Sequence, residues 1–449
     1  MLITNANIIT FQKPNRILSD SAILIKNGVI EKIGKNKELI ETFPHEEKIN
    51  AKSYFILPGN LCSHTHFYSA FSRGLSIPGD PPSAFPEILS KLWWKLDKSL
   101  KPEDIYLSTL ISLIDAIKHG TTSQIDHHAS QNSISHSLDR IAQAVQESGL
   151  RACLCYEVTD RDGNRKAKEG IKENVRFLEL LKKNKYFNNR ISGLFGLHSS
   201  FTLSDKTLDT CRSLIPENNG YHLHVAEHNI DEYDSLKKTG KRVVERLYDY
   251  GILGTKTIAA HCVNLDLKEM LLLKETGTWV THQPRSNMNN AVGMADVESM
   301  LNAGIIVGLG NDGFSNAMWD EWRTTYLVHK LWNRDPRKMG ADTILQMAVY
   351  NNAEIVNSIF DRRIKVGIIE EGANADLIFV DYDPVTPLSI ENLPWHMIFG
   401  FRDSMVKTTI VDGKIIMLDS EIKTLDEDHI AFEAQRASKQ VWNRFLQQK

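Results

Sequence analysis

The stretch FILPGNLCSHTHF, residues 55–67, joins a strand-like apolar run to two histidines, His64 and His66. Side chains alternate along a β-strand, so histidines two residues apart project their imidazoles to the same face. Imidazole is a common ligand of zinc, copper, iron and nickel. The pair therefore indicates either half of a metal site or two ordinary histidines. Further ligands elsewhere in the chain would decide between these alternatives.

Short apolar runs recur along the middle of the chain, and helix-like stretches lie between most of them. Including residues 55–64, the eight predicted strands cover residues 121–126, 151–157, 191–198, 221–227, 257–262, 278–282 and 305–312. Alternating strands and helices are typical of parallel βα units. Eight such units predict an α/β fold of the (β/α)8, TIM-barrel type.

A titratable residue stands at or just past the C-terminal end of each predicted strand. These residues are His64 and His66, Asp126, Glu157, His198, His224 and Glu227, His261, His282, and Asp312. In a (β/α)8 barrel the C-terminal strand ends converge on the face that holds active sites. Scattered histidines would not be expected to mark so many strand ends, so the metal-site interpretation of the first pair gains support.

The two ends of the chain resemble each other and differ from the middle. Both contain short strands with turn signals at Asn27-Gly28 and Asp412-Gly413. The segments 1–56 and 370–449 are therefore predicted to form one small β-sandwich domain, which includes an amphipathic C-terminal helix. Residues 57–369 are predicted to form the barrel, the catalytic domain.

The composition of the 449-residue chain argues against several classes of partner. A net charge of −3 gives no basic stripe for nucleic acid. No apolar run approaches the roughly 20 residues of a membrane helix, and the first residues do not resemble a secretion signal. The five scattered cysteines fit reduced thiols in the cytoplasm; they are Cys62, Cys153, Cys155, Cys211 and Cys262.

Several motifs, in order along nearly the whole chain, resemble the amidohydrolase superfamily. They are LPGNLCSHTHFYSAFSRG, HLHVAEH, AAHCVNL, THQPRSNM, GLGNDG and GANADLIFVDYDP. The resemblance is to the aminohydrolase and chlorohydrolase branch (ATZ/TRZ-like), which includes guanine, S-adenosylhomocysteine and triazine hydrolases. Within it, SHTHFYSAFSRG, LWWKLD, IDHHAS and RSNMNN are most similar to the SsnA aminohydrolases, which are associated with selenium-dependent and purine catabolic gene sets.

The resemblance implies that His64, His66, His224 and Asp312 bind one divalent metal ion. Three imidazoles and a carboxylate suit zinc, the expected metal, while iron(II) and manganese are alternatives. Water on such a metal is acidified to near neutrality and becomes a hydroxide nucleophile. Binuclear members of the superfamily carry a lysine on the fourth strand. The segment ISGLFGLH contains no lysine, which predicts a mononuclear site.

The same resemblance implies catalytic roles for three residues. Asp312 would take the proton of the attacking water, and His261 would orient the hydroxide or the group that it attacks. Glu227 would carry a proton to a ring nitrogen and then to the departing amine. The predicted reaction is the hydrolytic deamination of a planar nitrogen heterocycle, purine-like or pteridine-like, by a hydrolase that acts on C–N bonds other than peptide bonds.

Other polar residues near the strand ends are candidates for substrate binding. They are His198, His282, the RSN stretch of Arg285, Ser286 and Asn287, and Arg73. His198 is nearly as well explained as a core histidine. Asn311 precedes Asp312 where the branch usually has threonine or serine, which puts the orientation of Asp312 in question.

Two other functions remain open at this stage. The same site can support a ring-opening amidohydrolase or a chlorohydrolase that acts on a purine-breakdown or triazine-like compound. A catalytically inactive barrel that serves as a scaffold is a minor alternative, because such proteins usually lose the ligands that this chain keeps. A homodimer or larger homo-oligomer is expected from the family.

Overall fold

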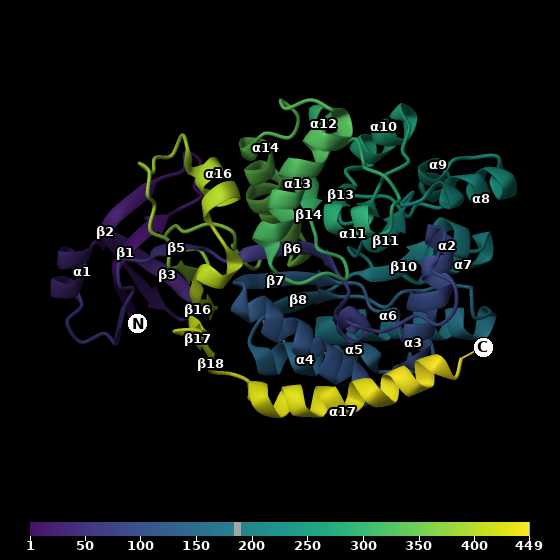
Figure 1. Ribbon diagram of the computed structural model, residues 1–449, viewed down its shortest axis with the longest axis horizontal. Coiled ribbons are helices and arrows are strands. Elements are labelled where there is room, and N and C mark those ends of the chain that lie inside the picture. The colour runs from purple at the N-terminus through teal and green to yellow at the C-terminus, as the bar shows by residue number, and fades with distance from the viewer. Residues whose placement is uncertain (184–189, 449) are drawn as a thin grey trace.

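The computed structural model describes residues 1–183 and 190–448. Two parallel sheets form the centre of the fold (Figure 1). The four-stranded sheet contains β6 (Asn60–Thr65), β7 (Thr121–Asp126), β8 (Arg151–Leu154) and β9 (Ile191–Gly193). The five-stranded sheet contains β10 (Phe195–Ser199), β11 (Tyr221–Val225), β12 (Ile258–His261), β13 (Trp279–His282) and β14 (Val307–Leu309). The predicted α/β class is confirmed.

Helices follow the strands and cover their outer face, so the strands are buried along their whole length. Fully buried strands of this kind are characteristic of parallel sheets. The longer helices of this layer are α4 (Pro102–Lys118), α5 (Ser137–Ser148), α6 (Asn164–Lys183), α7 (Asp205–Leu214), α8 (Asn229–Thr239), α9 (Val243–Asp249), α10 (Leu267–Thr276), α13 (Met318–Asn333) and α15 (Asn352–Ile359). Shorter helices are α2 (Phe85–Ile88), α3 (Trp94–Ser99), α11 (Pro284–Asn289), α12 (Val297–Asn302) and α14 (Ala341–Leu345).

The two parallel sheets are joined on both sides. On one side the amide of Leu194 donates to the carbonyl of Leu154 (3.1 Å), and Val158 forms a parallel bridge with Leu197. On the other side Thr65, at the end of β6, forms a parallel bridge with Asp312, just beyond β14. The first and last parallel strands therefore meet at the residues that the sequence marks as metal ligands.

The predicted strand 55–64 is in fact two strands that belong to different sheets. β5 (Phe55–Pro58) pairs with β1 and with β15, whereas β6 pairs with β7. Between them, a Cβ atom at Gly59 would lie 2.2 Å from the side chain of Thr122. The sequence showed one apolar run because both strands are buried, and the predicted domain boundary after residue 56 falls inside β5.

Strands from both ends of the chain share a third sheet. Its order is β18-β17-β16-β15-β5-β1-β2-β3, with β4 also paired to β1. The strands are β1 (Leu2–Ile9), β2 (Ile17–Lys26), β3 (Val29–Lys35), β4 (Lys48–Asn50), β15 (Leu377–Val380), β16 (Val406–Val411), β17 (Lys414–Leu418) and β18 (Glu421–Ile422), and the short helices α1 (Asn36–Thr42) and α16 (Leu393–Trp395) lie between strands. A buried ion pair joins this sheet to β8, since Arg151 contacts Asp376 (3.1 Å) and Asp412 (2.7 Å).

The predicted C-terminal helix is α17 (Glu427–Leu446), and it packs on helices α3 and α4 beside the parallel sheets instead of on the terminal sheet (Figure 1). Asp426 begins the helix by accepting a hydrogen bond from the amide of His429 (3.0 Å). The helix runs along α3 and α4, and its Trp442 indole donates to the carbonyl of Phe71 (2.8 Å). Residues far apart in sequence thus support the segment that follows β6.

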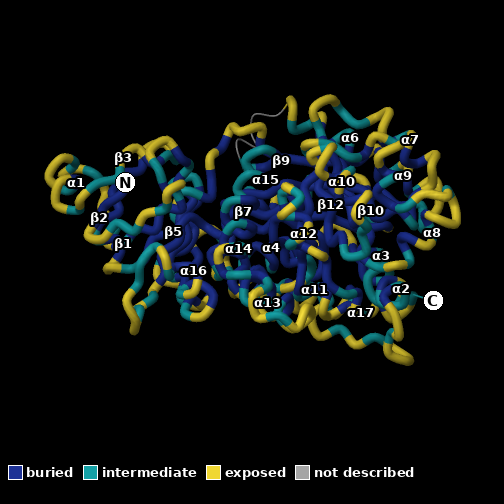
Figure 2. The backbone as a smooth tube through the Cα atoms, turned by 90° about the horizontal axis from the view of Figure 1, so that it is seen from above, coloured by how far each residue is buried: buried dark blue, intermediate teal, exposed yellow. Residues whose placement is uncertain are grey.

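Buried residues fill both the parallel sheets and the terminal sheet (Figure 2). All five cysteines are buried with free thiols, and Cys153 lies in β8, with Cys155 directly after it. Within residues 1–183 and 190–448, none of the helices has both the length and the apolar character required to span a membrane.

Candidate active site

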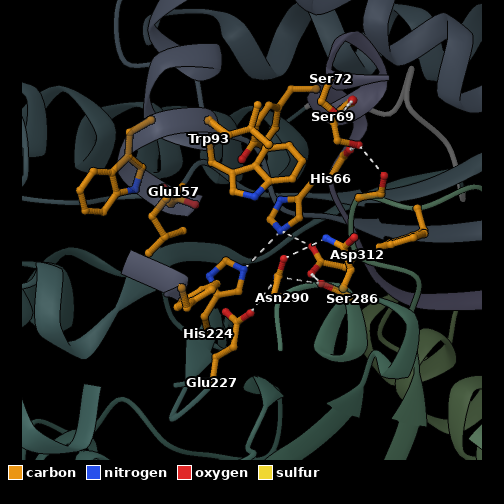
Figure 3. A pocket seen from close by; sticks show the side chains of 18 of the residues that line it. His66, Ser69, Ser72, Trp93, Glu157, His224, Glu227, Ser286, Asn290 and Asp312 are labelled. Atoms are coloured by element: carbon orange, nitrogen blue, oxygen red, sulfur yellow. Dashed lines mark hydrogen bonds and ion pairs between the residues drawn. The ribbon is translucent and has the colours of Figure 1, made fainter. Parts of the chain in front are cut away.

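A cavity of about 560 Å³ opens at the C-terminal ends of the parallel strands. One side is apolar and aromatic, with Trp93, Trp94 and Phe85 from the segment between β6 and α4, and Phe201 from the segment after β10. The other side is polar and contains the strand-end residues (Figure 3). A mostly apolar hollow with a few convergent polar groups is the usual form of a small-molecule site.

Four predicted ligands meet at the floor of this cavity: His66, His224 and Asp312 line it, and His64 is fully buried next to them. Nε2 of His66 lies 3.0 Å from Asp312 Oδ1 and 3.3 Å from His224 Nε2. Nε2 of His64 lies 3.8 Å from the same Asp312 oxygen. Figure 3 shows His66, His224 and Asp312 pointing toward one another. The sequence therefore brings together His64 from β6, His66 directly after β6, His224 from β11, and Asp312 from beyond β14.

Each ligand imidazole is held by its other ring nitrogen. In His66, Nδ1 lies 2.5 Å from the carbonyl oxygen of His127, and in His224, Nδ1 lies 3.3 Å from the carbonyl oxygen of His198. In His64, Nδ1 lies 2.8 Å from His222 Nε2. A carbonyl oxygen can only accept a hydrogen bond, so Nδ1 of His66 and of His224 carries a hydrogen, and Nε2 is the ring nitrogen that faces the cluster. This arrangement is typical of histidines that bind metals.

The donor set fits a divalent metal ion. Nε2 of His64 is buried and has no hydrogen-bond partner among the described residues. Burial, reinforced by neighbouring imidazoles, lowers the pKa of His64 and of His224 well below the usual range of histidine. Burial opposes a charge on His66 as well, but the Asp312 carboxylate raises the pKa of His66 to about 9, so the cluster attracts positive charge. Inward-facing nitrogens and a buried carboxylate are expensive to bury without such a charge. Zinc accepts three imidazoles and one carboxylate.

The two other catalytic candidates lie beside this cluster. Nε2 of His261 is 3.7 Å from Glu227 Oε2 and 3.8 Å from Asp312 Oδ2. The backbone is left-handed at His261 (φ 72°) and Asp312 (φ 55°). Such conformations cost of order 1–3 kcal/mol and concentrate at functional sites. Burial raises the pKa of Glu227 to about 7, although His261 opposes the shift.

The predicted substrate residues fall into two groups. His198 and Arg73 line the cavity, and His198 Nδ1 lies 2.7 Å from the Thr202 hydroxyl. His282, Arg285 and Asn287 are not among its lining residues.

The second group makes its polar contacts outside the cavity lining. Asn287 Oδ1 lies 2.8 Å from His261 Nδ1, and His282 Nε2 lies 3.0 Å from His329 Nε2. Arg285 forms an ion pair with buried Glu321 and donates to the carbonyl of Ser315 (2.8 Å). Of these three residues only Asn287 contacts a catalytic candidate, so Asn287 is a candidate positioning residue for His261.

Ser286 and Asn290 are polar residues of the cavity wall; the sequence predicted Ser286 on the substrate side together with Arg285 and Asn287, whereas Asn290 was not identified. The Ser286 hydroxyl donates to Asp312 Oδ2 (2.5 Å), and Asn290 Nδ2 donates to Glu227 Oε1 (3.5 Å). Asn311 instead binds the following loop, donating to the carbonyl of Ser315 (3.0 Å). The orientation of Asp312 is thus supported by Ser286 from α11, whatever residue precedes the carboxylate.

Comparisons with known proteins agree with this geometry. A family model described as "Amidohydrolase family" matches residues 55–416. The 5'-deoxyadenosine deaminase of Methanosarcina mazei is 32% identical over 447 residues, covering 98% of each chain. The 5-methylthioadenosine/S-adenosylhomocysteine deaminase of Acetivibrio thermocellus is 32% identical over 447 residues, covering 98% of this chain and 99% of its own.

A solved structure supports the fold. The crystal structure of an adenosine deaminase from Xanthomonas campestris with bound zinc superposes with a TM-score of 0.85 at 22% identity, covering 98% of each chain. The relatives fit the predicted branch, while similarity to the SsnA group stays a prediction. The prediction of a hydrolase of C–N bonds is confirmed: the chain belongs to the amidohydrolase family.

Proposed function

We propose that this protein is a mononuclear, metal-dependent aminohydrolase that removes an amino group from a purine-like heterocycle. The observation that carries the proposal is the convergence of three inward-facing imidazole nitrogens and the Asp312 carboxylate on one cavity floor, beside Glu227 and His261. The relatives named above as deaminases of 5'-deoxyadenosine and of 5-methylthioadenosine make an adenosine-type nucleoside the first substrate to test.

His64, His66, His224 and Asp312 would hold the metal ion, for which we propose zinc. Such an ion, when bound, supplies Lewis acidity that makes a water molecule nucleophilic near neutral pH. Asp312 is also the group that takes a proton from the attacking water. Its Oδ2 already accepts the Ser286 hydroxyl, which fixes the carboxylate while it acts as a base.

Glu227 is the proton carrier on the substrate side. Its carboxyl is buried in the cavity wall and has a pKa near 7, so a proton is available for a ring nitrogen at neutral pH. That proton makes the adjacent carbon electrophilic, and a second one allows the amine to leave as ammonia. His261 lies between the two carboxylates and orients the group under attack. In the net reaction, the amino-substituted ring carbon and water are converted into a ring carbonyl and ammonia.

Three further features belong to the proposal. We propose that the two parallel sheets form one closed (β/α)8 barrel, in agreement with the contacts at both of their junctions. We propose that the terminal sheet is a separate small domain. We also propose a homo-oligomer, since Leu327, Leu331 and Trp332 of α13 expose 55%, 76% and 61% of their surface.

The test is metal analysis together with ammonia release from adenosine, 5'-deoxyadenosine, 5'-methylthioadenosine, S-adenosylhomocysteine and guanine. We expect about one metal ion per chain and release from at least one compound. A His64→Asn, His66→Asn variant should lose both, whereas His136→Asn, at an exposed histidine outside the cavity, should lose neither. Two metal ions per chain would contradict the mononuclear site, and a metal-loaded protein inactive on the whole panel would contradict deamination.

A further inference from the structure

Glu157, just beyond β8, places a carboxylate in the cavity wall that the proposed reaction does not use. The side chain is 4% exposed and lines the cavity. Among the residues that the structure describes, it has two polar neighbours at ion-pair distance: His127 Nδ1 at 3.5 Å and Arg161 NH1 at 3.9 Å. In Figure 3 Glu157 and Asp312 lie on opposite sides of His66. A buried acceptor with such long contacts is open to a ligand.

The neighbouring Arg161 offers a donor at the same place. Its side chain is 7% exposed, and it also lines the cavity. Two of its nitrogens are engaged, with Asp97 and with Asp162 (3.3 Å). The third, NH1, has no hydrogen-bond partner within the described part of the chain and faces Glu157. The Arg161 guanidinium packs on the Trp94 ring, with its Cζ 5.3 Å from the ring centroid, and this contact holds the guanidinium in position.

A second metal ion is a poor occupant of this place. Nε2 of His127 faces the carbonyls of Leu197 (2.9 Å) and His222 (3.1 Å), so only its Nδ1 is available. Nearby His224 has one free ring nitrogen, Nε2, and that nitrogen already points into the ligand cluster with His66. A second cation would therefore find only His127 Nδ1 and Glu157, too few protein ligands for a stable site.

The pair instead matches one edge of an oxidised heterocycle. A carboxylate can only accept hydrogen bonds and a guanidinium can only donate them. Burial opposes ionisation of Glu157, but His198, His127 and Arg161 hold its pKa below the usual range. A ring that presents –NH–C(=O)– places an N–H beside a carbonyl oxygen, which complements adjacent acceptor and donor groups. An adenine ring presents the lone pair of N7 at the corresponding edge and would face the carboxylate unfavourably.

We propose that Glu157 and Arg161 form a lactam-binding subsite, and that the preferred substrates are aminopurine-like rings with an –NH–C(=O)– edge, as in 8-oxoadenine derivatives. Glu157 accepts the N7–H and Arg161 NH1 donates to the C8 oxygen, while Glu227 serves the ring nitrogen on the other side of the reacting carbon. This inference rests on the proposed deaminase function and narrows its substrate class.

The test compares the binding of two deamination products, inosine and 8-oxoinosine, to the metal-loaded enzyme by calorimetry. Neither product has an amine left to lose, so the readout does not depend on turnover. Hydrogen bonds to charged groups predict that 8-oxoinosine binds at least about 10-fold more tightly than inosine. In Glu157→Gln the amide can donate to N7 of inosine, so the preference should fall to less than about threefold or reverse.

A matched substitution, Glu103→Gln at an exposed carboxylate, should keep the wild-type preference. Equal binding of the two products by the wild type, undetectable binding of both, or a preference unchanged in Glu157→Gln would each overturn the subsite. Ammonia release from the substrate panel is a separate measurement. A protein that deaminates 5'-deoxyadenosine without preferring the 8-oxo product keeps the proposed function and loses this inference.

Discussion

Replacing Ser286 with alanine tests how Asp312 is held. The Ser286 hydroxyl donates to Asp312 Oδ2 at 2.5 Å, and His261 Nε2 lies 3.8 Å from the same oxygen. A hydrogen bond to a charged group contributes about 1.5–3 kcal/mol. That range corresponds to roughly 10- to 150-fold in an equilibrium or rate constant. We expect Ser286→Ala to lose this factor in metal affinity, in kcat/KM, or shared between the two.

The assay is competition for zinc with a chromophoric chelator, followed by kcat/KM with the metal-saturated enzyme. Ser72→Ala is the matched control, because the Ser72 hydroxyl lines the same cavity but donates to the carbonyl of Ser69 (2.8 Å). That variant should stay within about twofold of the wild type. If Ser286→Ala also stays within about twofold in both measurements, the carboxylate is oriented by other groups and our account of its support is refuted.

Three further results are expected. Glu227→Gln should keep the metal ion but lower kcat by a factor of about 10²–10⁴. Because Glu227 acts in its protonated form and its pKa is about 7, the kcat/KM of the wild type should fall as the pH rises through 7. An unchanged rate in the variant would exclude the role assigned to Glu227. Arg151→Met leaves the buried Asp376 carboxylate without its ion-pair partner and should lower the free energy of unfolding in urea by about 3–5 kcal/mol. Lys26→Met, at an exposed ion pair, should change the free energy of unfolding by less than about 1 kcal/mol. Equal effects of the two substitutions would contradict the importance of burial. Removal of the metal ion by a chelator should abolish activity and lower the thermal midpoint of unfolding. If the free metal concentration had been 100 times its Kd, the lost stability is about 2.7 kcal/mol. One equivalent of zinc should restore both activity and thermal midpoint, whereas unchanged activity after chelation would show that no metal is required.

The ligand cluster could be predicted because strand periodicity and parallel-strand topology act together. A strand places His64 and His66 on one face, and parallel strands bring their C-terminal ends to the same side of the sheet. Local sequence therefore determines which residues meet, even when His66 and His224 are far apart in the chain. The roles of these residues came from the family resemblance, and the experiments above are what tests them.

The wall residues were harder to predict because they depend on the phase of one short helix. In α11, Ser286 and Asn290 are four residues apart and share a face, which turns toward the cavity. Arg285 and Asn287 stand beside Ser286 in sequence but point away. A stretch of polar residues contains no amphipathic signal, so neither the helix nor its orientation was apparent. Glu157 was visible as a strand-end carboxylate, but only the structure places Arg161 beside it.

The attachment of α17 to the segment after β6 has a consequence for biosynthesis. The Trp442 indole donates to the carbonyl of Phe71, and the Arg444 guanidinium donates to the carbonyl of Ser99. Both ends of the segment that carries Trp93 and Trp94 are therefore supported by residues that are synthesised near the end of translation. At about 5–20 residues per second, Trp442 leaves the ribosome's synthetic centre roughly 6 to 26 s after Asp312. During that interval all four ligands have been translated, but the wall above them is not yet secured. A metal ion bound at that stage would enter through a cavity whose wall α17 does not yet support, and substrate recognition would be completed last.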